Sequence, residues 1–312
     1  MIHVLAFYYF VKIEDPELEV CRHKKFFKDR DVTARIYISH EGINGQMSAS
    51  IADSIAYQEW MHEDSRFSKV EFKVNQYHEH VFPRLTVKVR EQLVALDQNV
   101  DPIDGGERLT PKLWKEMLET KGEETLLLDV RNDYEWEVGH FEGADLPNLE
   151  KFRQFPEWAR ELKETRDPKK TRVMMYCTGG IRCELYSVLL KKEGFEQVFQ
   201  LEGGVIKYGK EVGSQHWRGK LFVFDDRMAV PIAEDGHDEV ISHCAHCETL
   251  SDVYYNCANM ECNNLFLSCP VCAEKLLGCC SEACRNAERV RPYMKEARPK
   301  PFRKKHLLEP LA

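Results

Sequence analysis

The segment Cys177-Thr178-Gly179-Gly180-Ile181-Arg182 decides the fold of the middle of the chain. It follows Val173 to Tyr176, a short apolar run of the kind that is buried in parallel sheets, and a helix is expected from about Cys183. In such a strand, loop and helix, the backbone N–H groups of the loop converge on one point. Here that point is the sulfur of Cys177. Converging N–H dipoles favour an anion, so we expect Cys177 to have a lowered pKa and to act as a nucleophile.

The other residues of the loop support this interpretation. Gly179 and Gly180 let the backbone curl without Cβ clashes, and Arg182 is suited to be a fixed positive neighbour of the sulfur. Cys183 lies six residues after Cys177 and is either a resolving thiol or an inert cysteine facing the helix. The predicted site comprises the catalytic candidates Cys177, Arg182 and Cys183 and the loop residues Thr178, Gly179, Gly180 and Ile181.

Three further motifs accompany the loop along the chain. They are Asp129-Val130-Arg131, Gly139-His140-Phe141-Glu142-Gly143-Ala144 and Leu201-Glu202-Gly203-Gly204. We expect Asp129 and Arg131 to pair with neighbouring groups and to shape the pocket. Together the four motifs closely resemble the rhodanese homology domain over roughly Leu109 to Lys220. In that family the loop cysteine holds a sulfane sulfur as a persulfide. The six-residue loop of this chain has the length found in sulfurtransferase-like members, whereas the related phosphatases have a loop one residue longer.

The N-terminal part of the chain indicates a second domain. Strands are predicted at Val4 to Val11, Thr33 to Ser39, Val70 to Val74 and Leu85 to Val89, with helices at Glu17 to Arg30 and Ser50 to Met61. Glu41 to Gly45 is predicted to be a turn. Interpreted as β-α-β-β-α-β, the order matches a ferredoxin-like split βαβ unit, a fold that implies no chemistry of its own.

The predicted fold class is therefore α/β and α+β, in several domains. With 312 residues, of which 43 % are hydrophobic, the chain can bury two or three cores. We predict an N-terminal ferredoxin-like βαββαβ domain at 1–100, a turn-rich linker at 101–108, a rhodanese-like α/β domain with a parallel sheet at 109–220, and a Cys-rich metal-binding module with a basic tail at 221–312.

The distribution of cysteines and apolar residues predicts a cytoplasmic protein without membrane contact. No basic region precedes the apolar stretch Val4 to Val11, and no window approaches the roughly 18 to 20 apolar residues of a transmembrane helix. Nine of the 12 cysteines fall between Cys244 and Cys284. In a reducing compartment, such short spacings favour metal over disulfides.

The cysteine cluster consists of four pairs, enough for two tetrahedral zinc sites. The first and third pairs can share one ion and the second and fourth the other, which leaves Cys279 or Cys280 spare; pairing by neighbours is the alternative. Two structural zinc ions are the preferred interpretation, and an iron–sulfur cluster is the competitor. The predicted ligands are Cys244, Cys247, Cys257, Cys262, Cys269, Cys272, Cys280 and Cys284.

The net charge of -8 argues against nucleic acid on its own, but it hides an asymmetry. Between Arg285 and His306 nine Lys or Arg stand against two Glu, so this stretch carries +7 and the remainder -15. Such a tail can follow an RNA backbone, although a solvated C-terminus is the plainer interpretation. The RNA-binding candidates are Arg285, Arg289, Arg291, Lys295, Arg298, Lys300, Arg303, Lys304 and Lys305.

Three blocks extend the resemblance to nearly the whole chain. They are Ser39 to Gly45, Cys177 to Glu184, and Phe222 to Arg227 followed by the paired cysteines. These blocks resemble the bacterial rhodanese-like tRNA uridine hydroxylases. The resemblance implies an oxidoreductase that uses O2 as co-substrate to convert the wobble uridine, position 34 of tRNA, to 5-hydroxyuridine. It implies the tRNA anticodon arm as partner, and a sulfur- or electron-donor protein is a further candidate. No dinucleotide fingerprint, haem ligand or iron triad in the sequence would activate O2.

The nucleophilic loop suggests a chemical role within that reaction. Addition of a Cys177 thiolate or persulfide to C6 of uracil would make C5 electron-rich towards an oxidant. Two alternatives stay open: a sulfurtransferase that moves sulfane sulfur through a Cys177 persulfide, and a non-enzymatic zinc-containing adaptor or persulfide sensor. RNA-dependent product formation separates the two enzymes, and cyanide-releasable sulfur without turnover on RNA favours the adaptor.

Overall fold

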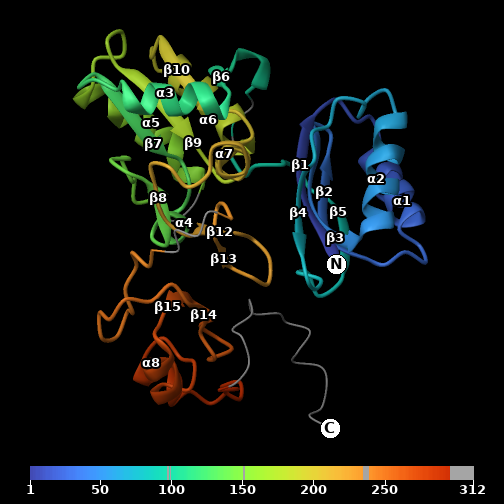
Figure 1. Ribbon diagram of the computed structural model, residues 1–312, viewed down its shortest axis with the longest axis vertical. Helices are drawn as coiled ribbons and strands as arrows, with labels where there is room; N and C mark the ends of the chain where they lie inside the picture. Colours follow the sequence, from blue (N-terminus) through green and yellow to red (C-terminus); the bar gives the residue numbers. More distant parts are fainter. Residues whose placement is uncertain (97, 99, 150–151, 235–238, 296–312) are drawn as a thin grey trace. The chain divides into compact units, whose positions relative to one another are not determined.

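The computed structural model describes residues 1–96, 98, 100–149, 152–234 and 239–295. The described residues form two compact units, one within residues 1–132 and 144–212 and the other within residues 133–143, 213–234 and 239–295. The first unit contains a five-stranded and a four-stranded sheet, and the second contains small two-stranded sheets (Figure 1). In the described part of the chain, no helix is long and apolar enough to cross a membrane.

The N-terminal sheet has the strand order β4-β1-β3-β2-β5, and two helices cover one of its faces (Figure 1). Asp15 caps the first helix by accepting a hydrogen bond from the N–H of Leu18, and Pro16 occupies the first turn. The four strands β4-β1-β3-β2 are antiparallel, which confirms the predicted ferredoxin-like fold, and β5 adds a parallel edge strand. The elements are β1 (Ile2–Phe10), α1 (Pro16–Phe26), β2 (Val32–Ser39), β3 (Gly42–Ser50), α2 (Ile51–Glu63), β4 (Lys73–Tyr77) and β5 (Leu85–Val89).

Two predictions for this domain are wrong. The stretch Glu41 to Gly45 is not a turn, because only His40 and Glu41 turn and strand β3 starts at Gly42. This strand lacks an apolar alternation because its partner β1 needs small residues: a Cβ at Gly45 would lie 2.2 Å from the ring of Phe7. The strand predicted at 70–74 lies at Lys73–Tyr77 instead. Val70 is buried in the core, but it belongs to a turn in which its N–H donates to the carbonyl of residue 67.

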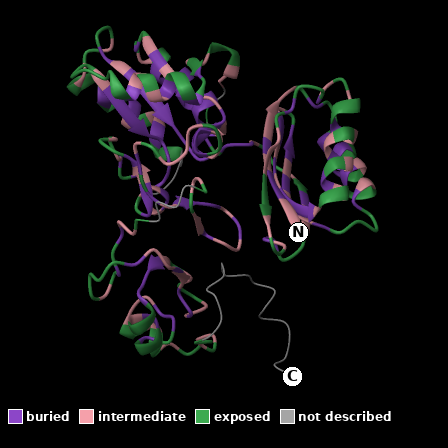
Figure 2. Ribbon diagram, viewed as in Figure 1, coloured by how far each residue is buried: buried purple, intermediate pink, exposed green. Residues whose placement is uncertain are grey.

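The central sheet is fully parallel, with the strand order β6-β10-β9-β7. Leu126 and Leu128 face the core under α5 and α6, whereas Tyr176 meets Trp114 of α3 at 6.2 Å between ring centroids. Helices therefore cover both faces, and Figure 2 shows the strands buried between them. The elements are η1 (Pro102–Asp104), β6 (Glu107–Leu109), α3 (Pro111–Glu119), β7 (Thr125–Asp129), η2 (Phe152–Gln154), α5 (Phe155–Thr165), β9 (Arg172–Tyr176), α6 (Ile181–Lys192), β10 (Gln197–Leu201) and α7 (Gly204–Val212).

The second unit is built from short elements around small apolar clusters. One cluster joins Val138, Phe222 and Tyr254, and another joins Cys257, Phe266 and residue 279. Because these clusters bury little apolar surface, a bound metal ion or a covalent cross-link would add to the folding stability of this unit. The elements are α4 (Asp133–Trp136), β8 (Gly139–Phe141), β11 (Trp217–Gly219), β12 (Leu221–Phe222), β13 (Ala229–Val230), β14 (Tyr254–Asn256), β15 (Leu265–Leu267), α8 (Pro270–Lys275) and α9 (Glu282–Arg285).

Candidate functional site

Cys177 lies in the loop between the end of β9 and the start of α6. Its side chain is fully buried, and its Sγ accepts a hydrogen bond of 3.1 Å from the backbone N–H of Gly180. Gly180 is the N-cap of α6 and has a φ of 102°. This left-handed conformation would be strained for a residue with a side chain. The glycine therefore allows the loop to fold back so that backbone N–H groups point at the sulfur.

The surroundings of Cys177 favour its thiolate. Burial alone raises the pKa of a thiol, but a hydrogen bond from Cys183, the charge of Arg182 and the backbone N–H groups of Arg182 and Gly180 bring the pKa of Cys177 down to about 5. Burial holds the pKa of Cys183 well above its usual range, so this thiol stays protonated and donates to Cys177. At neutral pH the site thus contains one thiolate, in the loop, in contact with one thiol, in the first turn of α6.

Arg182 is fixed beside the sulfur. Its guanidinium is almost fully buried and its Nη2 donates a hydrogen bond of 3.2 Å to Oγ1 of Thr178. We expect the variant Arg182→Met to raise the pKa of Cys177 by about one to two pH units, because a close opposite charge shifts a pKa by that amount. The shift in pKa is measured from the rate at which iodoacetamide alkylates Cys177 between pH 4 and 9. Peptide mass spectrometry quantifies the alkylated cysteine.

In the wild-type protein the alkylation rate should rise through pH 5 and stay level above pH 6, because the thiolate fraction is then complete. In Arg182→Met the rise should move to higher pH. Arg160→Met serves as the control, since Arg160 is exposed on α5. An Arg182→Met curve that overlays the wild-type curve would show that the arginine does not stabilise the thiolate.

Two of the other motifs support the loop. Asp129 and Arg131 form a fully buried ion pair in which Nη2 lies 2.6 Å from Oδ2, and the guanidinium lies 5.8 Å from the ring centroid of Tyr176. Gly204 passes so close that a Cβ there would lie 2.6 Å from the carbonyl oxygen of Cys177. The next residue, Val205, donates its N–H to that same oxygen at 3.1 Å. Both motifs therefore position the strand end and the loop.

Residues from distant parts of the sequence also reach this loop. The Tyr8 hydroxyl of β1 donates to Oε1 of Glu184 at 2.9 Å, and Arg108 holds both oxygens of that carboxylate at 3.1 and 2.8 Å. A Cβ at Gly180 would lie 2.8 Å from the Tyr8 oxygen, so Tyr8 covers the loop. No motif in the sequence indicated Tyr8 or Arg108.

Lys73 of β4 is the third residue that the motifs did not indicate. In the register of β1 and β4 it lies opposite Ala6, so it shares a sheet face with Tyr8, and its Nζ lies 5.0 Å from the Tyr8 ring centroid. Burial lowers the pKa of Lys73 to about 8, and the Cys177 thiolate is the first of the charges that oppose this change. A lysine ammonium therefore lies within electrostatic range of the thiolate.

The predicted metal ligands come together in two groups. One contains Cys244, Cys247, Cys269 and Cys272 and the other Cys257, Cys262, Cys280 and Cys284, and in each group the ligand atoms lie within 4.8 Å of one another. Individual Sγ–Sγ distances of 3.7 Å are far too long for disulfides and match the separation of about 3.8 Å that a tetrahedral Zn–S length of roughly 2.3 Å implies. The chain thus holds two cysteine groups that could each bind one metal ion, in the interleaved arrangement.

Comparison with known proteins places these features in one family. Family models match residues 2–93 (UPF0176 acylphosphatase like domain), 110–211 (Rhodanese-like domain) and 218–285 (Rhodanase C-terminal). A tRNA uridine(34) hydroxylase of Protochlamydia amoebophila is 57% identical over 97% of this chain and 94% of that protein. The chain belongs to the tRNA uridine(34) hydroxylase family. Proteins of the same name from Chlamydia caviae and Chlamydia trachomatis serovar D are 52% identical over 98% of this chain and 92% and 93% of theirs.

In this member of the tRNA uridine(34) hydroxylase family, the cations predicted to bind RNA are partly engaged within the chain. Arg285, Arg289 and Lys295 form ion pairs with carboxylates at 3.2, 2.7 and 2.8 Å. Arg291 donates to the carbonyl of Asn256 at 3.1 Å and to that of residue 257. The remaining candidates, Arg298, Lys300, Arg303, Lys304 and Lys305, lie outside the described residues.

Proposed function

We propose that this protein hydroxylates uridine 34 of tRNA to 5-hydroxyuridine and that Cys177 is its nucleophile. The observation that carries the proposal is a buried cysteine with its pKa lowered to about 5, in a chain 57% identical to a protein named for this activity. The anticodon arm of tRNA is the substrate in this proposal, O2 supplies the oxygen atom, and a donor protein supplies the electrons. Its proposed location is the cytoplasm.

The first chemical step follows from the thiolate. The Sγ of Cys177 adds to C6 of the uracil ring, the S–C6 bond forms, and the C5–C6 π bond breaks. The electron pair moves onto C5 and the C4 carbonyl oxygen, so C5 becomes the nucleophilic carbon that the hydroxylation requires. No leaving group and no redox change are involved in this addition. Because Cys177 is fully buried, the flipped base reaches it only when the cover over the loop moves aside.

The other residues of the site have supporting roles in this proposal. Arg182 stabilises the thiolate by its charge, and the Cys183 thiol donates a hydrogen bond to it. Asp129 and Arg131 brace the end of the preceding strand. The two cysteine groups hold structural zinc in this proposal. The proposed domains are the ferredoxin-like domain at 1–100, the linker at 101–108, the rhodanese-like domain at 109–220 and the metal-binding module with its basic tail at 221–312. The residues that shape the loop around the sulfur are Thr178, Gly179, Gly180 and Ile181.

The direct test is nucleoside mass spectrometry of total tRNA from cells that lack the gene and from the same cells carrying the wild-type gene. Loss of 5-hydroxyuridine and its derivatives, restored by the wild-type gene, is the expected result. Unchanged levels would overturn the proposal. In that case cyanide-releasable sulfur on Cys177 would support the second candidate, a sulfurtransferase, which the adjacent thiolate and thiol of Cys177 and Cys183 would also serve.

Lys73 is proposed as a residue that positions and stabilises the reacting charge. Its ammonium lies near the Cys177 thiolate and can donate to the carbonyl oxygen on which negative charge develops. We expect Lys73→Met to lower 5-hydroxyuridine formation about tenfold to a hundredfold. The same variant should shift the alkylation curve of Cys177 to higher pH, which a purely structural role would not do. Lys73→Arg should restore both; an unmoved alkylation curve in Lys73→Met would remove Lys73 from the site.

A further inference from the structure

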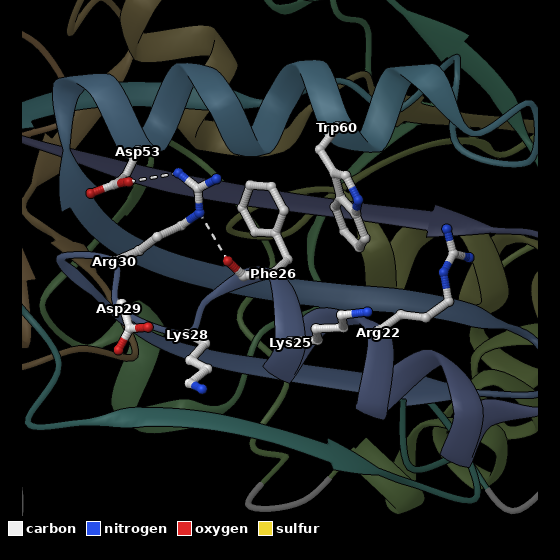
Figure 3. Close-up of a pocket in the computed structure, with 8 residues that line it drawn as sticks. All are labelled: Arg22, Lys25, Phe26, Lys28, Asp29, Arg30, Asp53 and Trp60. Atoms are coloured by element: carbon white, nitrogen blue, oxygen red, sulfur yellow. Dashed lines mark hydrogen bonds and ion pairs between the residues drawn. The ribbon is translucent and has the colours of Figure 1, made fainter.

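A basic hollow lies on the N-terminal domain, at the end of α1 and alongside α2. Its volume is about 670 Å³. Figure 3 shows its lining as two aromatic rings between two arginines, with lysines below them. The lining residues are Arg22, Lys25, Phe26, Lys28, Asp29, Arg30, Asp53 and Trp60. Neither the rhodanese loop nor the cysteine groups contribute to it.

The arginines and the aromatic rings form one continuous row. Phe26 and Trp60 are stacked with ring centroids 4.7 Å apart, and both rings are partly exposed. The guanidinium of Arg30 lies 4.3 Å from the Phe26 centroid, and that of Arg22 lies 5.6 Å from the Trp60 centroid (Figure 3). The rings thus separate two guanidinium groups that are held in place at either end.

Carboxylates fix these arginines without using all of their donors. Arg30 donates from Nε to the carbonyl of Phe26 and from Nη1 to Asp53, and Arg22 donates from Nη1 to Glu19 and Asp64. Within the described residues, Nη2 of Arg30 and Nε and Nη2 of Arg22 make no hydrogen bond. An ordered guanidinium with remaining N–H groups is suited to bind phosphate, since little side-chain entropy is lost on binding.

The two lysines add mobile charge to this fixed frame. Lys25 and Lys28 are exposed, and neither ammonium makes an ion pair with a described residue. From Arg22 to Arg30 the chain carries five Lys or Arg against one Asp, although the whole protein has a net charge of -8. Cations in the last turn of a helix also complement its dipole. The dipole does not account for two partly exposed rings in the same hollow. Cations together with aromatic surfaces are typical of sites for nucleic acid.

We propose that this hollow binds the phosphodiester backbone of the tRNA substrate, with the free N–H groups of Arg22 and Arg30 and the ammonium groups of Lys25 and Lys28 as the phosphate ligands. The inference rests on the proposed function, because that function makes tRNA the polyanion that this protein must hold. It places an RNA contact on the domain that does not carry Cys177.

Binding of a fluorescent tRNA transcript to the full-length protein tests this. The double variant Lys25→Glu/Lys28→Glu should weaken the affinity at least tenfold at a fixed salt concentration, and the slope of log K against log salt should fall by about two. The matched control is Lys24→Glu/Lys69→Glu, which makes the same charge change with two exposed lysines of the same domain that do not line the hollow. It should weaken binding less than threefold.

Two results would overturn the inference. One is wild-type affinity in the Lys25→Glu/Lys28→Glu protein, and the other is equal weakening by the control variant. Thermal melting of both variants verifies that they fold. A protein that forms 5-hydroxyuridine but gives one of these results retains its proposed function and loses only the hollow as the RNA contact.

Discussion

Replacement of Cys177 by serine is expected to reduce 5-hydroxyuridine in tRNA at least about 100-fold, to the level of cells without the gene. The thiolate is the reactive form, and a serine hydroxyl in the same loop is not ionised at neutral pH. The Gly180 N–H and the Arg182 charge would then surround a neutral group. Nucleoside mass spectrometry of tRNA from complemented deletion cells measures the loss.

Cys183→Ser is the matched control for this experiment, because Cys183 is equally buried and contacts Cys177. A serine hydroxyl can still donate to the thiolate, so we expect this variant to retain activity within about tenfold of the wild type. Equal loss in both variants would indicate that Cys183 relays sulfur or forms a disulfide with Cys177. A Cys177→Ser protein that still forms 5-hydroxyuridine would exclude the addition of this sulfur to the base.

The loop could be predicted from sequence because its determinants are contiguous. A buried strand, two glycines and a helix start within a dozen residues specify where backbone N–H groups point. Gly180 needs its left-handed φ of 102° for reasons local to the loop. The close approach of Gly204 to the carbonyl of Cys177 is visible only in the structure, although the Gly-Gly motif itself was apparent.

Tyr8, Lys73 and Arg108 could not be predicted, because they reach the loop through tertiary contacts. Tyr8 lies 176 positions before Glu184, to which it donates its hydrogen bond. In a strand, a tyrosine or lysine is ordinary, and nothing local distinguishes one that faces a distant loop and helix from one that faces water. The wrongly predicted turn at the start of β3 has a similar cause. A small residue is required in that strand because the ring of Phe7 on the neighbouring strand β1 leaves no room for a side chain at Gly45.

The pairing of the cysteines shows the same limit. Spacing identified four pairs of ligands, but interleaved pairing and pairing by neighbours both satisfied it. The structure selects the first and third pairs for one group and the second and fourth for the other. The antiparallel hairpin of β14 and β15 accounts for this pairing, because Cys247 precedes β14 and Cys269 follows β15 at its open end, whereas Cys257 lies in the loop at its other end.

Removal of one ligand should therefore remove one metal ion of two. We expect the wild-type protein to contain two zinc ions per chain by inductively coupled plasma mass spectrometry, and Cys257→Ala to contain one. A structural zinc site is worth about 10 to 16 kcal/mol of apparent binding free energy, so the module around the lost ion should unfold locally and become sensitive to protease. Cys279→Ala is the matched control, because both cysteines are fully buried in one apolar cluster and only Cys257 belongs to a ligand group.

A double variant decides how the ligands are shared. Cys257 and Cys284 belong to the same group in the structure, so Cys257→Ala/Cys284→Ala should still hold one zinc ion. If neighbouring pairs shared an ion, these two cysteines would serve different sites and both ions would be lost. Iron instead of zinc in the wild-type protein would contradict the assignment of the metal. Retention of two ions by Cys257→Ala would show that the fourth position of that group is filled by another ligand, and the stability of the module would then not depend on this thiolate.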